Sequence, residues 1–571
     1  MKKRLLLAAS TLAASLMSLG ATAAPNTNVA PSAKPNIVLI VLDDVGFSDL
    51  GAFGSEIRTP NIDALAATGL RYNRFDSKAV CTPTRAALLT GRNNQTVRMA
   101  DLPATERTDD MSRDRGEIAH NAQMLPQALK AAGYRTYGVG KWHLGPVYED
   151  GKTGNNASWP LQRGFDRFYG FYEGWTDQYH PKLIEGNSTL PKVDKPGYHF
   201  STDMADHAIA DIEDAAGKPF FLYFAMGTAH APLQVPSAYI DRYRGVYEKG
   251  WDAIRAERFA RMRKSGIIPA TANLTVRAPG DRAWAALSDD ERAVFARYMA
   301  TYAAFIEHAD AQIGRVVQQL KNAGRYDNSI IMLISDNGAA SEAGQDGGFE
   351  KMYRTSKFSV AEQRARIEEI GTDKLQPEYP RPWAWAGDTP FQRYKVWPYA
   401  GGVRTPLIIS WPHVIRDSGA VRTQFVDAID LAPTILDAAG TRFAPTIDGQ
   451  AQIPVAGQSI RTTFRNPSAT TRSVQYFELR GQRAIMSGNW RAVAMHKYGT
   501  DFAKDKWELF DISKDYSEST DLAARHPAKL AEMKALWWRE ARKYSTPPLA
   551  EPLEIFAKRA RYDDAFTETP K

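Results

Sequence analysis

A single cysteine, Cys81, is the first residue whose surroundings indicate chemistry. One cysteine cannot form a disulfide within its own chain, and a lone cysteine often serves only as a small buried hydrophobic side chain. The stretch from Ala79 to Gly91, however, predicts a loop, a helix cap at Thr82, Pro83 at the first helical position and then an apolar helix. Free amide groups at a helix N-terminus attract anions, and Arg85 adds a positive charge one turn further on. An oxyanion substrate therefore fits beside Cys81.

Four side chains that offer oxygen ligands follow two apolar runs, 36–42 and 329–335, which are typical of strands buried on both faces. These side chains are Asp43, Asp44, Asp336 and Asn337. Taken singly, an Asp-Asp or Asp-Asn-Gly sequence is also a common turn. Because the carboxyl ends of parallel strands meet at one edge of a sheet, we expect the four residues to converge there. An all-oxygen ligand set suits calcium or magnesium rather than zinc.

The elements that must position these residues alternate between strands and helices. Strand-like runs occur at 36–42, 219–224, 329–335 and 406–410, and helical patterns at 124–132 and 288–323. This alternation predicts an α/β fold whose large domain has a mixed, mainly parallel sheet covered by helices on both faces.

The pattern changes near Thr441. Short strand-like pieces follow at 474–477, 483–486, 490–493 and 507–510, and a helix is predicted from Pro527 to Lys543. Such a sequence predicts a smaller C-terminal antiparallel sheet with one helix packed on it. The predicted organisation is a signal peptide at 1–24, a catalytic domain at 25–440 and a C-terminal subdomain at 441–571.

Three long segments rich in Trp, Tyr, Gly and Pro interrupt the large domain, at 155–198, 239–281 and 339–394. Segments of this kind are usually lids or binding loops. The alternative is a decorated surface that has no role in binding a ligand.

The N-terminus has the three parts of a secretory signal: the basic residues 2–4, an apolar run at 5–19 and small residues at 21–24. The apolar run is too short for a membrane anchor, so we expect an exported, periplasmic or secreted protein without stable membrane association. The formal net charge is +7, and the sequence contains no dense run of Lys and Arg. We therefore expect no nucleic-acid partner.

Two stretches carry a resemblance to a known family. Residues 79–91 resemble the first sulfatase signature, Cys-x-Pro-x-Arg followed by Leu-Leu-Thr-Gly, and residues 133–143 resemble the second signature along its whole length. The resemblance extends from Asn36 to about Leu522. The sequence is thus identified as a member of the type I, formylglycine-dependent sulfatases in the alkaline phosphatase superfamily. The block 241–252 is similar to bacterial arylsulfatases.

This resemblance implies a sulfuric ester hydrolase, most simply an arylsulfatase, in which a formylglycine-generating enzyme has converted Cys81 to formylglycine. One hydroxyl of the aldehyde hydrate would attack sulfur, and the other would then collapse the covalent sulfate hemiester. The metal would be one divalent ion, calcium, held by Asp43, Asp44, Asp336, Asn337 and an oxygen derived from Cys81.

Other residues receive roles from the same resemblance. Arg85 is a catalytic residue that contributes its positive charge, Lys141 and Lys395 hold sulfate oxygens, and His143 hydrogen-bonds the hydrate. His230 lies on the leaving-group side, where it would act as general acid. Without the resemblance, a Lys-x-His sequence such as 141–143 would be interpreted as a solvated surface pair.

The sequence departs from the family at Ala400, where sulfatases usually carry Glu before a pair of glycines, so the local support of Lys395 differs here. Two alternatives to a sulfatase also stay open. The first is a phosphoesterase of the same fold class. The second is an exported protein that binds sulfate esters without turning them over.

Overall fold

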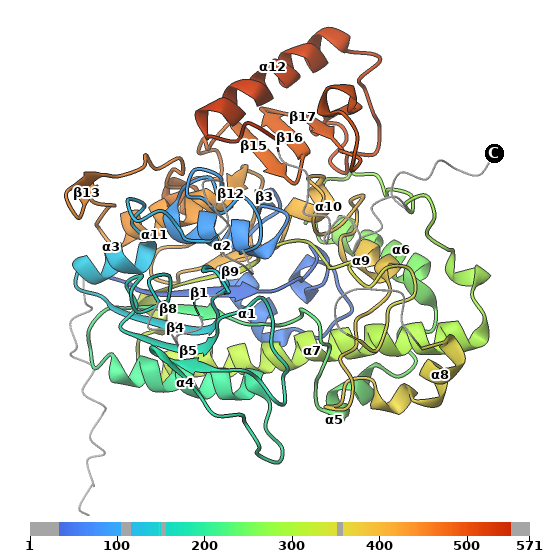
Figure 1. Ribbon diagram of the computed structural model, residues 1–571, viewed down its shortest axis with the longest axis horizontal. Helices are drawn as coiled ribbons and strands as arrows, with labels where there is room; N and C mark the ends of the chain where they lie inside the picture. Colours follow the sequence, from blue (N-terminus) through green and yellow to red (C-terminus); the bar gives the residue numbers. More distant parts are fainter. Residues whose placement is uncertain (1–33, 104–115, 148, 150–155, 351–357, 550–571) are drawn as a thin grey trace, which may run out of the picture. The chain divides into compact units, whose positions relative to one another are not determined.

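The computed structural model describes residues 34–103, 116–147, 149, 156–350 and 358–549 (Figure 1). The predicted signal peptide and small parts of two of the long interrupting segments lie outside these residues. The described residues from Lys34 onward belong to one compact unit. Among them, every helix is too short or too polar to cross a membrane.

The large sheet has ten strands in the order β11-β2-β10-β9-β1-β8-β4-β5-β6-β7. Its central strands β9, β1, β8, β4 and β5 are parallel, whereas β10 runs antiparallel to β9. The strand bounds are β1 Asn36–Leu42, β2 Leu70–Tyr72, β4 Arg135–Lys141, β5 Arg167–Phe171, β6 Ile184–Glu185, β7 Ser188–Thr189, β8 Phe220–Ala225, β9 Ser329–Ser335, β10 Leu407–Ser410 and β11 Val421–Arg422. The prediction of a mixed, mainly parallel sheet is confirmed.

Helices cover both faces of this sheet (Figure 1). Alternate residues of β1 show the two faces: Val38 and Ile40 join a core that includes residues of α4 and α7, whereas Ile37 and Leu39 join one that includes residues of α2, α3 and α11. Both faces are therefore apolar, which explains why β1 has no polar alternation. The helix bounds are α1 Pro60–Thr68, α2 Cys81–Thr90, α3 Leu125–Ala131, α4 Phe200–Asp214, α5 Ser237–Ile240, α6 Gly250–Lys264, α7 Asp289–Asn322, α8 Val360–Ala365, α9 Arg381–Gly387, α10 Ala400–Val403 and α11 Leu431–Ala438.

The C-terminal part contains a four-stranded antiparallel sheet, β15-β16-β17-β18, with α12 (Pro527–Lys543) packed on it. The strands are β15 Val474–Leu479, β16 Gln482–Ser487, β17 Trp490–Ala494 and β18 Trp507–Asp511. Trp537 of α12 is fully buried against this sheet and donates its indole N–H to the carbonyl oxygen of Phe477. The predicted antiparallel sheet with one helix is confirmed. Two further two-stranded sheets pair β3 (Phe75–Asp76) with β12 (Val426–Asp427) and β13 (Thr446–Ile447) with β14 (Gln450–Ala451).

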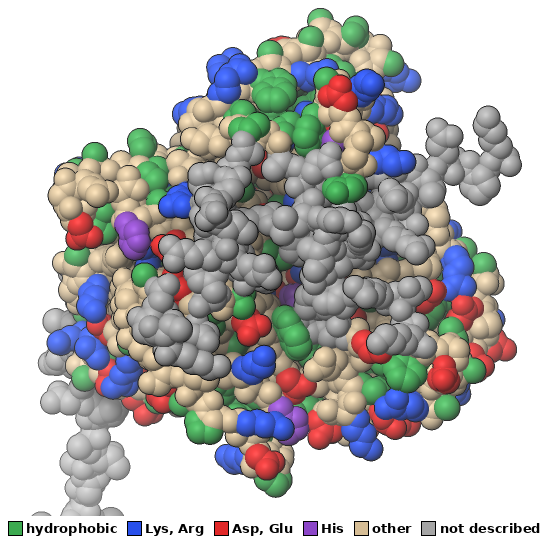
Figure 2. All heavy atoms as spheres, viewed as in Figure 1, with side chains coloured by type: hydrophobic (Ala, Val, Ile, Leu, Met, Phe, Trp, Pro, Cys, Tyr) green, Lys and Arg blue, Asp and Glu red, His purple; other side chains and the backbone are tan. Residues whose placement is uncertain are grey.

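Positive and negative side chains are interspersed over the described part of the face in Figure 2, with no single sign dominating it. Several ion pairs that join separate parts of the fold are buried instead. In one such group, Asp76 lies between two guanidinium groups, with Arg404 Nε 2.9 Å from Oδ1 and Arg491 Nη1 2.9 Å from Oδ2. Arg491 Nε also lies 2.8 Å from Oε1 of Glu518. All four side chains are fully buried, and they connect β17 of the C-terminal sheet to β3 and to the residue that follows α10.

We predict that Asp76→Ala lowers the free energy of unfolding by about 3–5 kcal/mol, because two buried guanidinium groups would lose the carboxylate between them. Asp289→Ala serves as the matched control, since Asp289 is 97% exposed where it pairs with Arg292 and should contribute little. Guanidinium unfolding followed by circular dichroism measures both. Equal destabilisation by the two variants would contradict a structural role for the buried pairs.

Candidate active site

The carboxyl ends of four neighbouring parallel strands bring the predicted site residues together. Asp43 and Asp44 follow β1, Asp336 and Asn337 follow β9, His230 follows β8, and Lys141 ends β4 with His143 just beyond it. Because β9, β1, β8 and β4 are adjacent in the sheet, these ends form one edge. The predicted convergence of the acidic pairs is confirmed: carboxylate oxygens of Asp43, Asp44 and Asp336 all lie within 4.8 Å of one another.

Helix α2 presents Cys81 to this edge. The helix begins at Cys81 itself, because Val80 has the extended conformation of an N-cap residue. The predicted cap at Thr82 is therefore wrong. Its hydroxyl instead donates to the carbonyl oxygen of His143 at 3.0 Å, which fastens the loop after β4 to the start of the helix. As a result, Cys81 Sγ lies 3.3 Å from His143 Nδ1.

The unmodified thiol of Cys81 is a poor nucleophile in this position. Burial raises its pKa to about 11, although the ammonium groups of Lys141 and Lys395 act in the opposite direction. The thiolate is the reactive form of cysteine, so almost none is present at neutral pH.

Each carboxylate at the edge has a buried cationic partner. Both Nε and Nη2 of Arg85 donate to Asp336 Oδ2, at 2.9 and 2.7 Å. Lys141 Nζ donates to Asp43 Oδ2 at 2.7 Å. The third pair joins Lys395 Nζ to the two oxygens of Asp44, at 2.9 Å for Oδ1 and 3.0 Å for Oδ2. Pairing of this kind makes it affordable to hold several charges away from water.

The electrostatics of the site leave Asp43 poorly compensated. Burial and the neighbouring carboxylate of Asp336 raise the pKa of Asp43 to about 7, despite the ammonium group of Lys141. In contrast, burial together with the nearby charges of Lys141 and Arg85 lowers the pKa of His143 well below its usual value. His143 is therefore a neutral imidazole near pH 7.

The residues present fit a hard divalent cation. Asp43 Oδ1 and Asn337 Oδ1 are both buried and accept no hydrogen bond from any described residue. Asn337 is held by its amide nitrogen, which donates to Asp44 Oδ1 at 2.6 Å and so leaves its oxygen available. Buried oxygens without donors are costly unless a cation or water satisfies them. The donor set contains only oxygens, as calcium and magnesium prefer.

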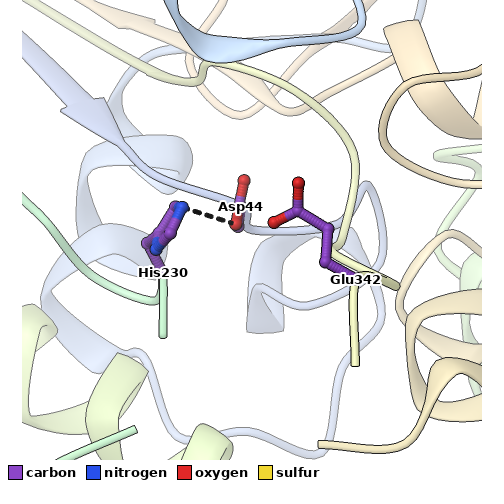
Figure 3. Close-up of side chains that lie close together, drawn as sticks. All are labelled: Asp44, His230 and Glu342. Atoms are coloured by element: carbon purple, nitrogen blue, oxygen red, sulfur yellow. Dashed lines mark ion pairs between the residues drawn. The ribbon is translucent and has the colours of Figure 1, made fainter. Parts of the chain in front are cut away.

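His230 and Glu342 border the acidic cluster (Figure 3). His230 Nε2 lies 3.7 Å from Asp44 Oδ2, and its Nδ1 lies 2.7 Å from the carbonyl oxygen of Ala231. Glu342 Oε2 accepts a hydrogen bond from Lys395 Nζ at 3.2 Å. No sequence motif marks Glu342 as a site residue. The only available signal was an acidic residue shortly after the end of the strand run 329–335.

The segment that carries Lys395 is held from two directions. After Lys395, the N–H group of Ala400 donates to Glu518 Oε2 at 2.9 Å. Before it, Gln392 Nε2 donates to the carbonyl oxygen of Glu518. The carboxylate of Glu518 thus lies beside the backbone of Ala400, the position at which sulfatases usually carry Glu. On the other side, the buried Arg255 of α6 donates to the carbonyl oxygen of Phe391 at 2.8 Å.

Two family matches agree with this architecture. Residues 35–441 match the sulfatase family, and residues 392–540 match the C-terminal part of N-sulphoglucosamine sulphohydrolase. An uncharacterized sulfatase of Schizosaccharomyces pombe is 32% identical over 533 residues, which cover 89% of this chain and 93% of the relative. An arylsulfatase of Klebsiella aerogenes is 29% identical, over 76% of this chain and 93% of its own. N-acetylgalactosamine-6-sulfatase of Rattus norvegicus is 26% identical, over 80% of this chain and 71% of the relative.

Solved structures show the same fold at lower sequence identity. Ps i-CgsB in complex with k-i-k-neocarrahexaose has a TM-score of 0.64 and 22% identity, over 94% of this chain and all of that one. BT4656 in complex with its substrate D-glucosamine-2-N,6-O-disulfate has a TM-score of 0.59 and 20% identity, over 90% of this chain and 99% of that one. Together with the two complete signatures and their convergence at one edge of the sheet, these matches show that the chain belongs to the sulfatase family, as a type I sulfatase of the alkaline phosphatase superfamily.

Proposed function

We propose that this sulfatase hydrolyses aryl sulfates to a phenol and inorganic sulfate, through a formylglycine made from Cys81. Hydrolysis of sulfate esters follows from its family, in which formylglycine and a metal ion are typical. The observation that carries the proposal is the position of Cys81 at the start of α2, beside His143 and in the electrostatic field of Lys141 and Lys395. A sulfate group bound there would meet a nucleophile and cations at once.

Support for an aryl leaving group comes from the Klebsiella arylsulfatase, which aligns over 93% of its length. Sugar sulfates are the second candidate class, because the rat relative is an N-acetylgalactosamine-6-sulfatase and the structure of BT4656 contains a glucosamine disulfate. The segments 155–198, 239–281 and 339–394 would shape the pocket for the leaving group, as we expect of long loops around an active site.

The proposed reaction has two steps. In the first, one hydroxyl of the hydrated formylglycine releases its proton to solvent and its oxygen bonds to sulfur, while the bond from sulfur to the leaving oxygen breaks and His230 gives that oxygen a proton. In the second, the remaining hydroxyl releases its proton, the aldehyde re-forms, and the bond from carbon to the sulfate oxygen of the hemiester breaks, which frees inorganic sulfate. A water molecule then adds to the aldehyde and restores the hydrate. Lys141 and Lys395 would bind sulfate oxygens throughout, and the neutral His143 would hydrogen-bond the hydrate.

We further propose that Asp43, Asp44, Asp336 and Asn337, with an oxygen derived from Cys81, hold a calcium ion. Such an ion supplies positive charge for the sulfate oxygens and for the formylglycine hydroxyl. The unsatisfied oxygens of Asp43 and Asn337 support this assignment.

Maturation and location are also proposals. The complete signature around Cys81 supports processing by a formylglycine-generating enzyme. The basic, apolar and small-residue parts of residues 1–24 support export to the periplasm or the medium.

We predict that active protein carries formylglycine at position 81, which tryptic peptide mass spectrometry detects because the aldehyde peptide is lighter than the thiol peptide. Cys81→Ala should abolish turnover without unfolding the protein. A fully active Cys81→Ala variant, or active protein that contains only the thiol, would exclude the mechanism.

Metal removal is expected to reduce thermal stability as well as activity, because three buried carboxylates would lose their shared counterion. Calcium should restore the melting temperature of chelated wild-type protein but not that of Asp43→Asn or Asn337→Ala. Scanning calorimetry and elemental analysis give readouts that do not depend on turnover. Full stability and activity in metal-free protein would contradict this site.

His230→Ala should slow esters of poor leaving groups about 10²-fold more than activated nitrophenyl esters, because only the former need a donated proton. The measurement is the slope of log kcat/KM against the pKa of the leaving phenol, which should steepen in the variant. If all esters slow equally, His230 binds sulfate or supports the structure, and another group is the acid.

A further inference from the structure

The ammonium group of Lys395 is shared between two carboxylates of different character. A lysine has three N–H donors. Two oxygens of Asp44 and one of Glu342 lie within 3.2 Å of Nζ, so the ammonium group bridges the two carboxylates. Asp44 belongs to the acidic cluster with Asp43 and Asp336, whereas Glu342 lies outside that cluster. Burial opposes the charge on Lys395, but these two carboxylates outweigh it and hold its pKa well above the usual value.

Glu342 is the outermost charge of this group. The exposed fraction of the side chain is 1% for Asp44, 2% for Lys395, 11% for His230 and 38% for Glu342. A carboxylate oxygen of Glu342 nevertheless lies within 4.8 Å of a ring nitrogen of His230 and of an oxygen of Asp44. Figure 3 shows the Glu342 carboxylate directed toward Asp44 from the opposite side to His230. A substrate held by Lys395 and His230 would therefore lie against a fixed negative charge.

The charge of the substrate then decides how strongly that carboxylate opposes binding. A sulfate monoester carries one negative charge at neutral pH. A phosphate monoester of the same shape carries close to two, because its second pKa is about 6. Charge repulsion scales with the product of the charges, so Glu342 costs the phosphate ester about twice what it costs the sulfate ester.

We propose that Glu342 is a specificity-determining residue that makes this site favour monoanionic sulfate esters over dianionic phosphate esters. This inference rests on the proposed binding of the sulfate group by Lys395. It assigns to Glu342 a task separate from the chemical steps: the residue reduces the positive charge that the site presents and thereby excludes the more highly charged ester.

One alternative use of the same residues predicts the opposite effect. Asp44, His230 and Glu342 could together hold a second divalent cation. A second cation would help a phosphate dianion to bind, and loss of Glu342 would then weaken phosphate turnover. We favour repulsion because Lys395 already occupies the position between Asp44 and Glu342.

The test compares 4-nitrophenyl sulfate with 4-nitrophenyl phosphate, which share a leaving group and differ in charge. In metal-loaded, formylglycine-containing Glu342→Gln, the ratio of kcat/KM for phosphate to that for sulfate should rise about tenfold over wild type at low salt, and the rise should shrink at high salt. Glu342→Asp keeps the charge and should keep the wild-type ratio. Glu532→Gln removes one charge from α12, where Glu532 pairs with Lys529, and controls for net charge.

A binding measurement makes the result independent of turnover. Calorimetry with inorganic sulfate, a dianion, and methanesulfonate, a monoanion, should show that Glu342→Gln tightens the dianion about tenfold more than the monoanion. If wild-type protein cleaves neither nitrophenyl ester, the proposed aryl sulfatase activity fails, and the binding ratio still decides the role of Glu342.

Two results would overturn the inference. Ratios that stay within twofold of wild type in both measurements would show that Glu342 does not sense substrate charge, and an equal change in both members of a pair would then show that it only positions Lys395. A fall in the phosphate-to-sulfate ratio of Glu342→Gln, with phosphate turnover that added divalent metal raises in wild type but not in the variant, would show a second cation site.

Discussion

Three carboxylates buried at the carboxyl edge of the sheet impose the main electrostatic constraint on this protein. Asp43, Asp44 and Asp336 lie within a few ångströms of one another, and their side chains are almost fully buried. Such a cluster is stable only when cations compensate it. Arg85, Lys141 and Lys395 do so from a helix, a strand and a loop, which fixes how those three elements meet.

The same pairs suit the proposed binding of a sulfate group. Cations that balance the carboxylates also lie near the start of α2, so they are ordered before a sulfate group binds. Oxygens of Asp43 and Asn337 that no described residue satisfies leave the proposed ion to complete the compensation. In the proposed mechanism, stability and catalysis thus depend on one set of charges.

The backbone around Lys395 is held by residues that lie outside the carboxyl edge of the large sheet. Arg255 of α6 and Glu518 of the C-terminal part hold the backbone on either side of it. Through Arg491 and Glu518, the C-terminal part contacts the segment that carries Lys395. The backbone N–H of Ala400 is thus satisfied by the carboxylate of Glu518.

The sequence by itself determined the regular elements and the two signatures. Strands 36–42 and 329–335 and the helix 527–543 end at the predicted residues, because continuous apolar runs and helical periodicity are local properties of the chain. The start of α2 was misjudged, because the hydroxyl of Thr82 bonds a loop 61 residues away and not its own helix. Glu342 and Glu518 were missed for a related reason. Their partners lie 53 and 118 residues distant, at Lys395 and Ala400, and loops without periodicity bring them together. Only the tertiary structure decides such contacts, because they depend on where the strands deliver the ends of those loops and not on the residues within them.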